Sequence, residues 1–72
     1  MLNKSEGRVA FFNADKGYGF IIPDAGGPDV FFHRYSLPDG IDELEKGQRV
    51  RYAVGESSRK PGQIEAVDIE VV

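Results

Sequence analysis

The apolar residues of this chain come in short segments that alternate with polar residues and end at turn signals. The longest unbroken apolar run is the four residues from Val9 to Phe12, and no segment repeats apolar residues at helical spacing for more than about one turn. Gly, Pro, Asn and Asp residues lie between the segments. Such a chain can bury its apolar side chains as the strands of a sheet, and a helical bundle is excluded.

Five segments have the composition and alternation of strands. They are residues Arg8–Asn13, Tyr18–Ile22, Asp29–His33, Arg49–Val54 and Ile64–Val72. The alternation shifts within the last segment, which predicts a bulge or a bend there. Residues 42–46, stopped by Gly47, are the one helical candidate, and they are long enough for about one 3-10 or α turn. We predict an all-β fold in which five antiparallel strands close into a small barrel, because closure removes exposed edges.

The length and composition limit what else the chain can be. Its 72 residues predict one small domain, residues 1–72. The absence of cysteine excludes disulfides and thiolate zinc sites, and the lone His33 excludes a histidine cluster, so we expect no metal and no other cofactor. No apolar run approaches the ~20 residues that cross a bilayer, and residues 1–6 lack the apolar region of a secretory signal. We therefore expect a cytoplasmic protein that does not enter a membrane.

The charge of the chain does not indicate a partner by itself. Nine Lys and Arg residues against twelve Asp and Glu residues give a net charge of −3, whereas nucleic-acid binders are more often basic. The distribution weakens this objection, because residues 36–72 hold eight of the acids and seven of the eight aromatic residues lie between Phe11 and Tyr35. One half of the chain is therefore aromatic and nearly neutral, and the other half is acidic.

The second and third segments are expected to place aromatic side chains on one outer face. A Gly- and Pro-rich turn joins these segments, so they should pair antiparallel, with side chains that alternate between two faces. The inward set is Ile21, Val30 and Phe32, and the outward set, bordered by Lys16, is Tyr18, Phe20, Phe31 and His33.

Burial of the outward rings in the core is the alternative, since large aromatic side chains usually bury. A closed barrel has a single interior, however, and cannot bury both faces of the same strands. Other residues already fill that interior: Val9, Ile21, Val30, Phe32, Val50, Tyr52, Val54, Ile64 and Val67 or Ile69. Exposed adjacent rings are stabilised by a flat partner, and unpaired bases offer π faces worth about 1–3 kcal/mol per stack by alanine substitution.

A sequence motif accompanies the aromatic pattern. The run Lys16-Gly17-Tyr18-Gly19-Phe20-Ile21 matches the opening of the RNP1 pattern, K/R-G-F/Y-G/A-F-V, with Ile in the last place. The RNA-recognition-motif fold is excluded, because it needs two helices and places its other aromatic segment first, whereas Val30–His33 follows here. This order, opened by Gly7-Arg8-Val9 and Phe12-Asn13 and followed by Gly47–Val50, resembles the cold-shock domain family over nearly the whole chain.

The resemblance implies a five-stranded OB-type barrel that stacks successive bases of single-stranded RNA or DNA, as an RNA chaperone or antiterminator does. The positions that match the family's stacking surface are Phe11, Lys16, Tyr18, Phe20, Phe31 and His33. We expect His33 to stack on or hydrogen-bond to a base, and Lys16 to contact phosphate. Gly17 and Gly19 are expected to leave room where a bent strand crowds its neighbour, because no helix follows to make them a dinucleotide loop.

The chain departs from the family at several positions. Ala10-Phe11 stands where Lys-Trp is common, which removes a cation and the largest stacking ring. Arg34 follows the histidine in place of an aromatic residue and can stack its guanidinium or hold a phosphate, and Tyr35 can compensate in part. The connection 55–62 is longer than usual, and its pair Arg59-Lys60 can contact phosphate.

Two functions of different classes remain open. The first is a module for single-stranded RNA or DNA, monomeric or weakly self-associating, that binds through Phe11, Lys16, Tyr18, Phe20, Phe31, His33, Arg34, Tyr35, Arg59 and Lys60. The second is a barrel of the same fold whose aromatic patch binds a polypeptide, which the acidic balance and the departures at Ala10 and Arg34 favour. We expect no enzymatic activity, because the serine and carboxylate residues have no evident catalytic partner besides the single histidine.

Overall fold

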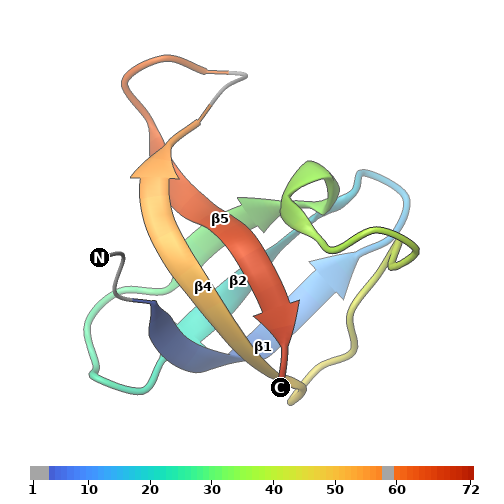
Figure 1. Ribbon diagram of the computed structural model, residues 1–72, viewed down its shortest axis with the longest axis horizontal. Coiled ribbons are helices and arrows are strands. Elements are labelled where there is room, and N and C mark those ends of the chain that lie inside the picture. Colours follow the sequence, from blue (N-terminus) through green and yellow to red (C-terminus); the bar gives the residue numbers. More distant parts are fainter. Residues whose placement is uncertain (1–3, 58–59) are drawn as a thin grey trace.

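A computed structural model describes residues 4–57 and 60–72 and has five antiparallel strands in one sheet. The strands lie in the order β3-β2-β1-β4-β5 (Figure 1), and their bounds are β1 Ser5–Asn13, β2 Tyr18–Pro23, β3 Val30–His33, β4 Arg49–Glu56 and β5 Ile64–Val71. The strands at the two ends of this order, β3 and β5, contact each other, so the sheet curls round into a barrel. The predicted all-β barrel of OB type is confirmed.

One extra residue in β1 determines where its aromatic side chains point. Val9 pairs with Ile21 of β2. The next pair is Phe11 with Phe20, so Ala10 is the extra residue of a β-bulge. Strict alternation would send Val9 and Phe11 to the same face. With the bulge, Val9 is buried and Phe11 is 42% exposed on the outer face.

A second bulge lies in β5, where the sequence predicts a bulge or a bend. Ala53 pairs with Val67. The next pair is Arg51 with Glu70, so β5 is one residue longer than β4 over this stretch. Asp68 lies within it and has a φ of 51°, in the left-handed region that Asp adopts more readily than most side chains. The irregularity predicted for this strand is confirmed.

The core is built from both halves of the chain. Its buried members among the described residues are Val9, Ile21, Phe32, Leu44, Val50, Tyr52, Ala66 and Ile69, and Val30 packs against them. The prediction is wrong for Val54 and Ile64, which are 53% and 60% exposed. β1 pairs with β4 only at residues 49–52, and Val54 and Ile64 lie where β4 and β5 continue as a hairpin (Figure 1) without β1 beside them, so their side chains stay exposed.

The helical candidate at residues 42–46 does not form a helical turn. This segment is irregular, and it inserts Leu44 into the core. One isolated helical turn forms too few hydrogen bonds to compete with burial of that side chain. Within the described residues the single helical turn is instead η1, Arg34–Ser36, where the Nδ1 atom of His33 accepts a hydrogen bond from the Tyr35 backbone N–H.

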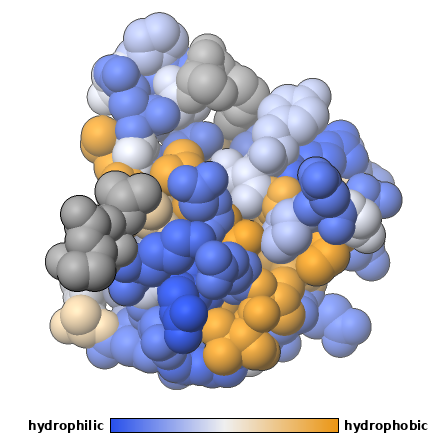
Figure 2. All heavy atoms as spheres, in the orientation of Figure 1, coloured by the Kyte–Doolittle hydropathy of each residue, from blue (hydrophilic) through white to orange (hydrophobic). Residues whose placement is uncertain are grey.

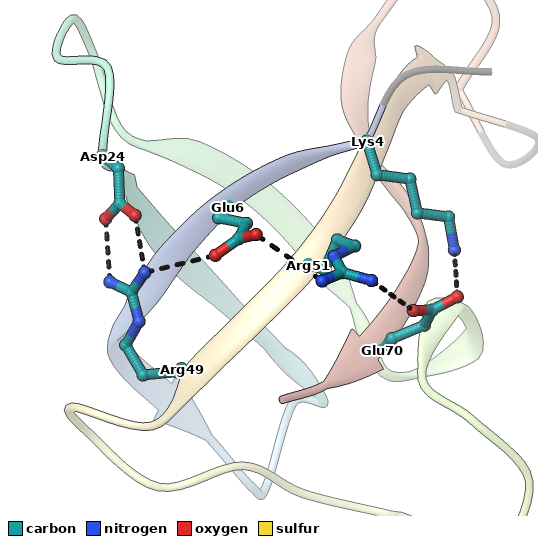
Figure 3. Close-up of polar contacts among 6 residues, drawn as sticks. All are labelled: Lys4, Glu6, Asp24, Arg49, Arg51 and Glu70. Carbon is teal, nitrogen blue, oxygen red and sulfur yellow. Dashed lines mark hydrogen bonds and ion pairs between the residues drawn. The ribbon is translucent and has the colours of Figure 1, made fainter.

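The outer face of β1, β4 and β5 carries a charge ladder, in which acids and bases alternate (Figure 3). Its members, in order, are Asp24, Arg49, Glu6, Arg51, Glu70 and Lys4. The closest ion pairs are Arg49–Asp24 at 2.6 Å, where two hydrogen bonds join the groups, and Lys4–Glu70 at 2.7 Å. Hydrophilic side chains dominate the middle of this face in the space-filling view (Figure 2). The acids and bases of the ladder balance each other.

A substitution at Gly19 tests whether β2 is crowded by its neighbours. A Cβ on Gly19 would press on the carbonyl oxygen of Phe11 and lie 2.8 Å from the ring of Phe32. We expect Gly19→Ala to lower the free energy of unfolding by about 1–3 kcal/mol, the usual cost of overpacking, in urea denaturation. The control is Gly55→Ala, because its Cβ would meet Val67 at an ordinary distance of 3.4 Å. Equal stability of the two variants would contradict the crowding.

The charge ladder makes stability depend on pH in the acid range. Hydrogen bonds from Arg49 hold the pKa of Asp24 below its usual value, and Lys4 lowers the pKa of Glu70 in the same way. A carboxyl group whose pKa is lower in the folded state contributes stability above its unfolded pKa, and this contribution is lost as pH falls through the folded pKa. We therefore expect Tm to fall as pH drops below about 4, the ordinary pKa of these groups.

Arg49→Met isolates the contribution of the ladder to this pH dependence. The variant should have a lower Tm than the wild type near neutral pH in low salt, and the difference should shrink in acid, where Asp24 is protonated in both proteins. Circular dichroism melting at both pH values measures it. Lys46→Met, at an exposed lysine outside the ladder, is the matched control. A difference that stays constant with pH would show that Arg49 acts through packing and not through charge.

Candidate nucleic-acid interface

Rings from three neighbouring strands lie together on the outer face of the barrel. We call them the aromatic platform, and its members are Phe11 of β1, Tyr18 and Phe20 of β2, and Phe31 and His33 of β3. Cross-strand pairing in the sheet places Phe11 opposite Phe20, Phe20 opposite Phe31 and Tyr18 opposite His33. The outward orientation expected from the alternation of β2 and β3 is confirmed, and the bulge in β1 adds one more ring to the set.

Contacts among the rings hold the platform in place without hiding it. Between ring centroids, Phe20 lies 5.6 Å from Phe11 and 5.8 Å from Phe31. Tyr18 stacks on Phe31 at 5.8 Å with an interplanar angle of 19°. Phe11 is exposed, and the other four members of the platform are half-buried. The rings are therefore partly accessible, in positions that their neighbours fix.

A glycine lets a second aromatic layer pack directly beneath the platform. Gly19 is buried between the positions of Tyr18 and Phe20 along β2. Phe32 lies under it, because a Cβ on Gly19 would come within 2.8 Å of that ring. Phe32 in turn stacks on Phe12 at 5.8 Å. The predicted role of Gly19, to leave room where the strand is crowded, is confirmed.

Two basic residues border one end of the platform. Lys16 lies in the β1–β2 turn, where its backbone N–H donates to Oδ1 of Asn13 at 3.0 Å. Arg34 follows β3, and its backbone N–H donates to the carbonyl of Gly17 at 2.8 Å. Both side chains are exposed, and neither forms an ion pair within the described residues. Sequence reasoning missed Asn13, although an Asn that ends a strand ahead of a turn is a signal for such a bond.

Tyr35 extends the aromatic surface beyond β3. Its ring centroid lies 4.4 Å from that of His33, and the side chain is 77% exposed. Its backbone N–H donates to Nδ1 of His33 at 3.3 Å, which fixes how the two residues sit relative to each other. A groove begins beside Tyr35 and is lined in part by Leu37 of the following loop and Ile69 of β5.

The second basic pair is not joined to the platform by any described contact. Lys60 is exposed in the β4–β5 connection, where its backbone N–H donates to Oγ of Ser57 and its carbonyl accepts from Gln63. Arg59 lies outside the described residues. The predicted site residues that the structure does bring together are Phe11, Lys16, Tyr18, Phe20, Phe31, His33, Arg34 and Tyr35.

The chemistry available at the platform is stacking, with anion contacts at its edge. Its rings offer π faces, and Lys16 and Arg34 offer N–H donors and positive charge. Across residues 4–57 and 60–72, no group of three or more His, Cys, Asp or Glu side chains comes close enough to hold a metal ion. No helix in this part of the chain is long and apolar enough to cross a membrane.

Known proteins share this sequence pattern along most of the chain. The profile of the family described as 'Cold-shock' DNA-binding domain matches residues 5–71. The cold shock-like protein CspG of Escherichia coli strain K12 is 39% identical over 70 residues, which cover 96% of this chain and 100% of that protein. The probable cold shock protein A of Mycolicibacterium smegmatis is 44% identical over 57 residues, or 78% of this chain and 85% of that protein. The resemblance in the sequence is thus confirmed, and the chain belongs to the cold-shock domain family.

Proposed function

We propose that the chain binds single-stranded RNA or DNA by stacking unpaired bases on the aromatic platform, as an RNA chaperone or a regulator of transcription or translation. The observation that carries this proposal is the contact among Phe11, Tyr18, Phe20 and Phe31, which remain partly accessible outside a separately filled core. Membership of a family described by DNA binding supports it. The protein acts in this proposal as a cytoplasmic monomer of one domain, and it binds without catalysing a reaction.

Stacking of bases on this platform supplies enough free energy for micromolar binding, without the help of a strongly basic surface. Each base stacked on an aromatic ring contributes about 1–3 kcal/mol by alanine substitution. Three or four stacks therefore amount to roughly 3–12 kcal/mol before the cost of ordering the strand is subtracted. Micromolar affinity corresponds to about −8 kcal/mol, which lies within this range.

The acids of the charge ladder do not oppose a nucleic acid at this site. Glu6, Asp24 and Glu70 are paired with bases in the charge ladder, so that face has little net charge to repel a strand. Lys16 and Arg34 instead present their charges at the platform edge. A single strand that meets the rings therefore also meets cations, although the chain as a whole has a charge of −3.

A barrel whose platform binds a polypeptide is the second candidate. The exposed rings of Phe11 and Tyr35 favour it, because an apolar peptide side chain also packs against an aromatic surface. Titration with a single strand and with the matching duplex separates the candidates. A nucleic-acid function requires tighter binding of the single strand, since the bases of a duplex are already stacked on each other.

Phe31→Ala tests the platform directly. We expect the substitution to weaken binding of a single-stranded oligopyrimidine by about 1–3 kcal/mol, because one base loses its stacking partner. Tyrosine fluorescence titration measures the affinity, and urea denaturation shows whether the variant is folded. Val54→Ala, which shortens an exposed apolar side chain on the β4–β5 hairpin, should bind like the wild type. Unchanged affinity in both Phe31→Ala and Phe20→Ala would remove the platform from the binding site.

The salt dependence of binding should be shallow, because few cations border the platform. If about 2–4 phosphates are neutralised, log K should fall by about 1.4–2.8 for each tenfold rise in salt, at 0.7 per phosphate of a single strand. Titrations at several salt concentrations give this slope. A slope near zero together with no preference for single strands would instead support the polypeptide partner.

A further inference from the structure

We infer that Arg34 and Lys16 form one phosphate-binding corner, which fixes where the sugar–phosphate backbone of a single strand meets the end of the aromatic platform. The inference rests on the proposed function and makes one part of it specific. It gives Arg34 a contact with a phosphodiester group and not with the face of a base.

The side chain of Arg34 folds back over the β1–β2 turn. A Cβ placed on Gly17 would lie 2.6 Å from Nε and 2.9 Å from Cζ of Arg34, so the guanidinium rests against the backbone of this glycine. The main chain of Arg34 bonds to the same residue, through the hydrogen bond to the Gly17 carbonyl. Gly17 has a φ of 75°, which a glycine adopts without strain. The end of β3 is thus attached to the turn by both side chain and main chain.

The same turn holds Lys16. Its backbone N–H donates to the side chain of Asn13, and the N–H of Gly17 donates to the Asn13 carbonyl at 2.7 Å. These bonds set the shape of the turn, so Lys16 emerges next to the glycine on which Arg34 rests. Lys16 and Arg34 thus bring two positive charges to the surroundings of Gly17, and an anion there is attracted by both.

Nearby acids do not neutralise this corner. Asp15 precedes Lys16 in the turn, is exposed, and forms no ion pair with either base in the described structure. The arginines of β4 differ, since Arg49 and Arg51 are both paired with acids of the charge ladder. Arg34, by contrast, lies beside the platform and has no ion-pair partner among the residues that the structure describes.

Phosphate suits this arrangement better than a stacked base does. Nε and Cζ of Arg34 lie against Gly17, and the exposed side chain offers its N–H groups to solvent. A guanidinium fork matches phosphate oxygens, and a lysine beside it adds a point charge. Stacking on the guanidinium would leave the charges of both residues without an anion. The two possibilities differ in a measurable way, because only a phosphate contact releases counterions from the strand.

The experiment is a salt titration of Arg34→Gln with oligothymidylate as the probe. We expect the slope of log K against log salt to become shallower by about 0.7, the value for one phosphate contact on a single strand. Lys16→Gln should have a similar effect. Arg51→Gln changes the net charge equally but removes an arginine of the charge ladder, so it should keep the wild-type slope.

Several results would overturn the inference. Weaker binding by Arg34→Gln with an unchanged slope would assign the residue to stacking, and unchanged affinity and slope would exclude it from the site. If Arg34→Gln does not fold, Arg34→Lys, which keeps the charge, should keep the slope, and a shallower slope in that variant would count against a phosphate contact. Failure of the proposed function is distinct, because the wild type would not bind oligothymidylate or Phe31→Ala would bind it equally well.

Discussion

The bulge at Ala10 divides the side chains of β1 between the interior and the surface. Val9 fills the core opposite Ile21, and the extra residue lets Phe11 reach the outer face opposite Phe20. If Ala10 were instead paired as a regular strand residue, Phe11 would share the inner face with Val9, and Phe20 would lose its neighbour on β1. The platform therefore depends on an irregularity of one strand, while β2 and β3 contribute their rings through ordinary alternation.

Charge is organised separately from the rings. In the charge ladder the acids and bases of β1, β4 and β5 pair across strands, with Asp24 and Lys4 at its two ends, so the charges of the ladder are balanced within the protein. Lys16 in the β1–β2 turn and Arg34 after β3 border the platform, and neither forms an ion pair with any residue that the structure describes. The net charge of the chain is thus a poor guide to the electrostatic potential at the platform, because it averages over faces that differ in charge.

Regular strands are the part of this molecule that a sequence predicts well. A period of two was sufficient to place Ile21 inside and Phe20 outside, since β2 has no irregularity between them. The outward position of Phe11 needed the family resemblance, because alternation alone gives the opposite face. Leu44 could not be predicted as core, since a lone apolar residue in an irregular segment has no period. The packing of Arg34 on Gly17 joins distant parts of the chain and leaves no local pattern.

Gly19 keeps the rings and their support apart. Phe32 and Phe12 pack beneath β2 at Gly19, where no side chain intervenes, so their packing does not depend on which ring lies on the outer face. Exchange of one aromatic residue for another at Phe11 or Phe31 alters the outer surface and leaves the packing of this inner layer unchanged. Single replacements can accordingly change the surface that this barrel presents to a ligand, without rebuilding the scaffold that carries it.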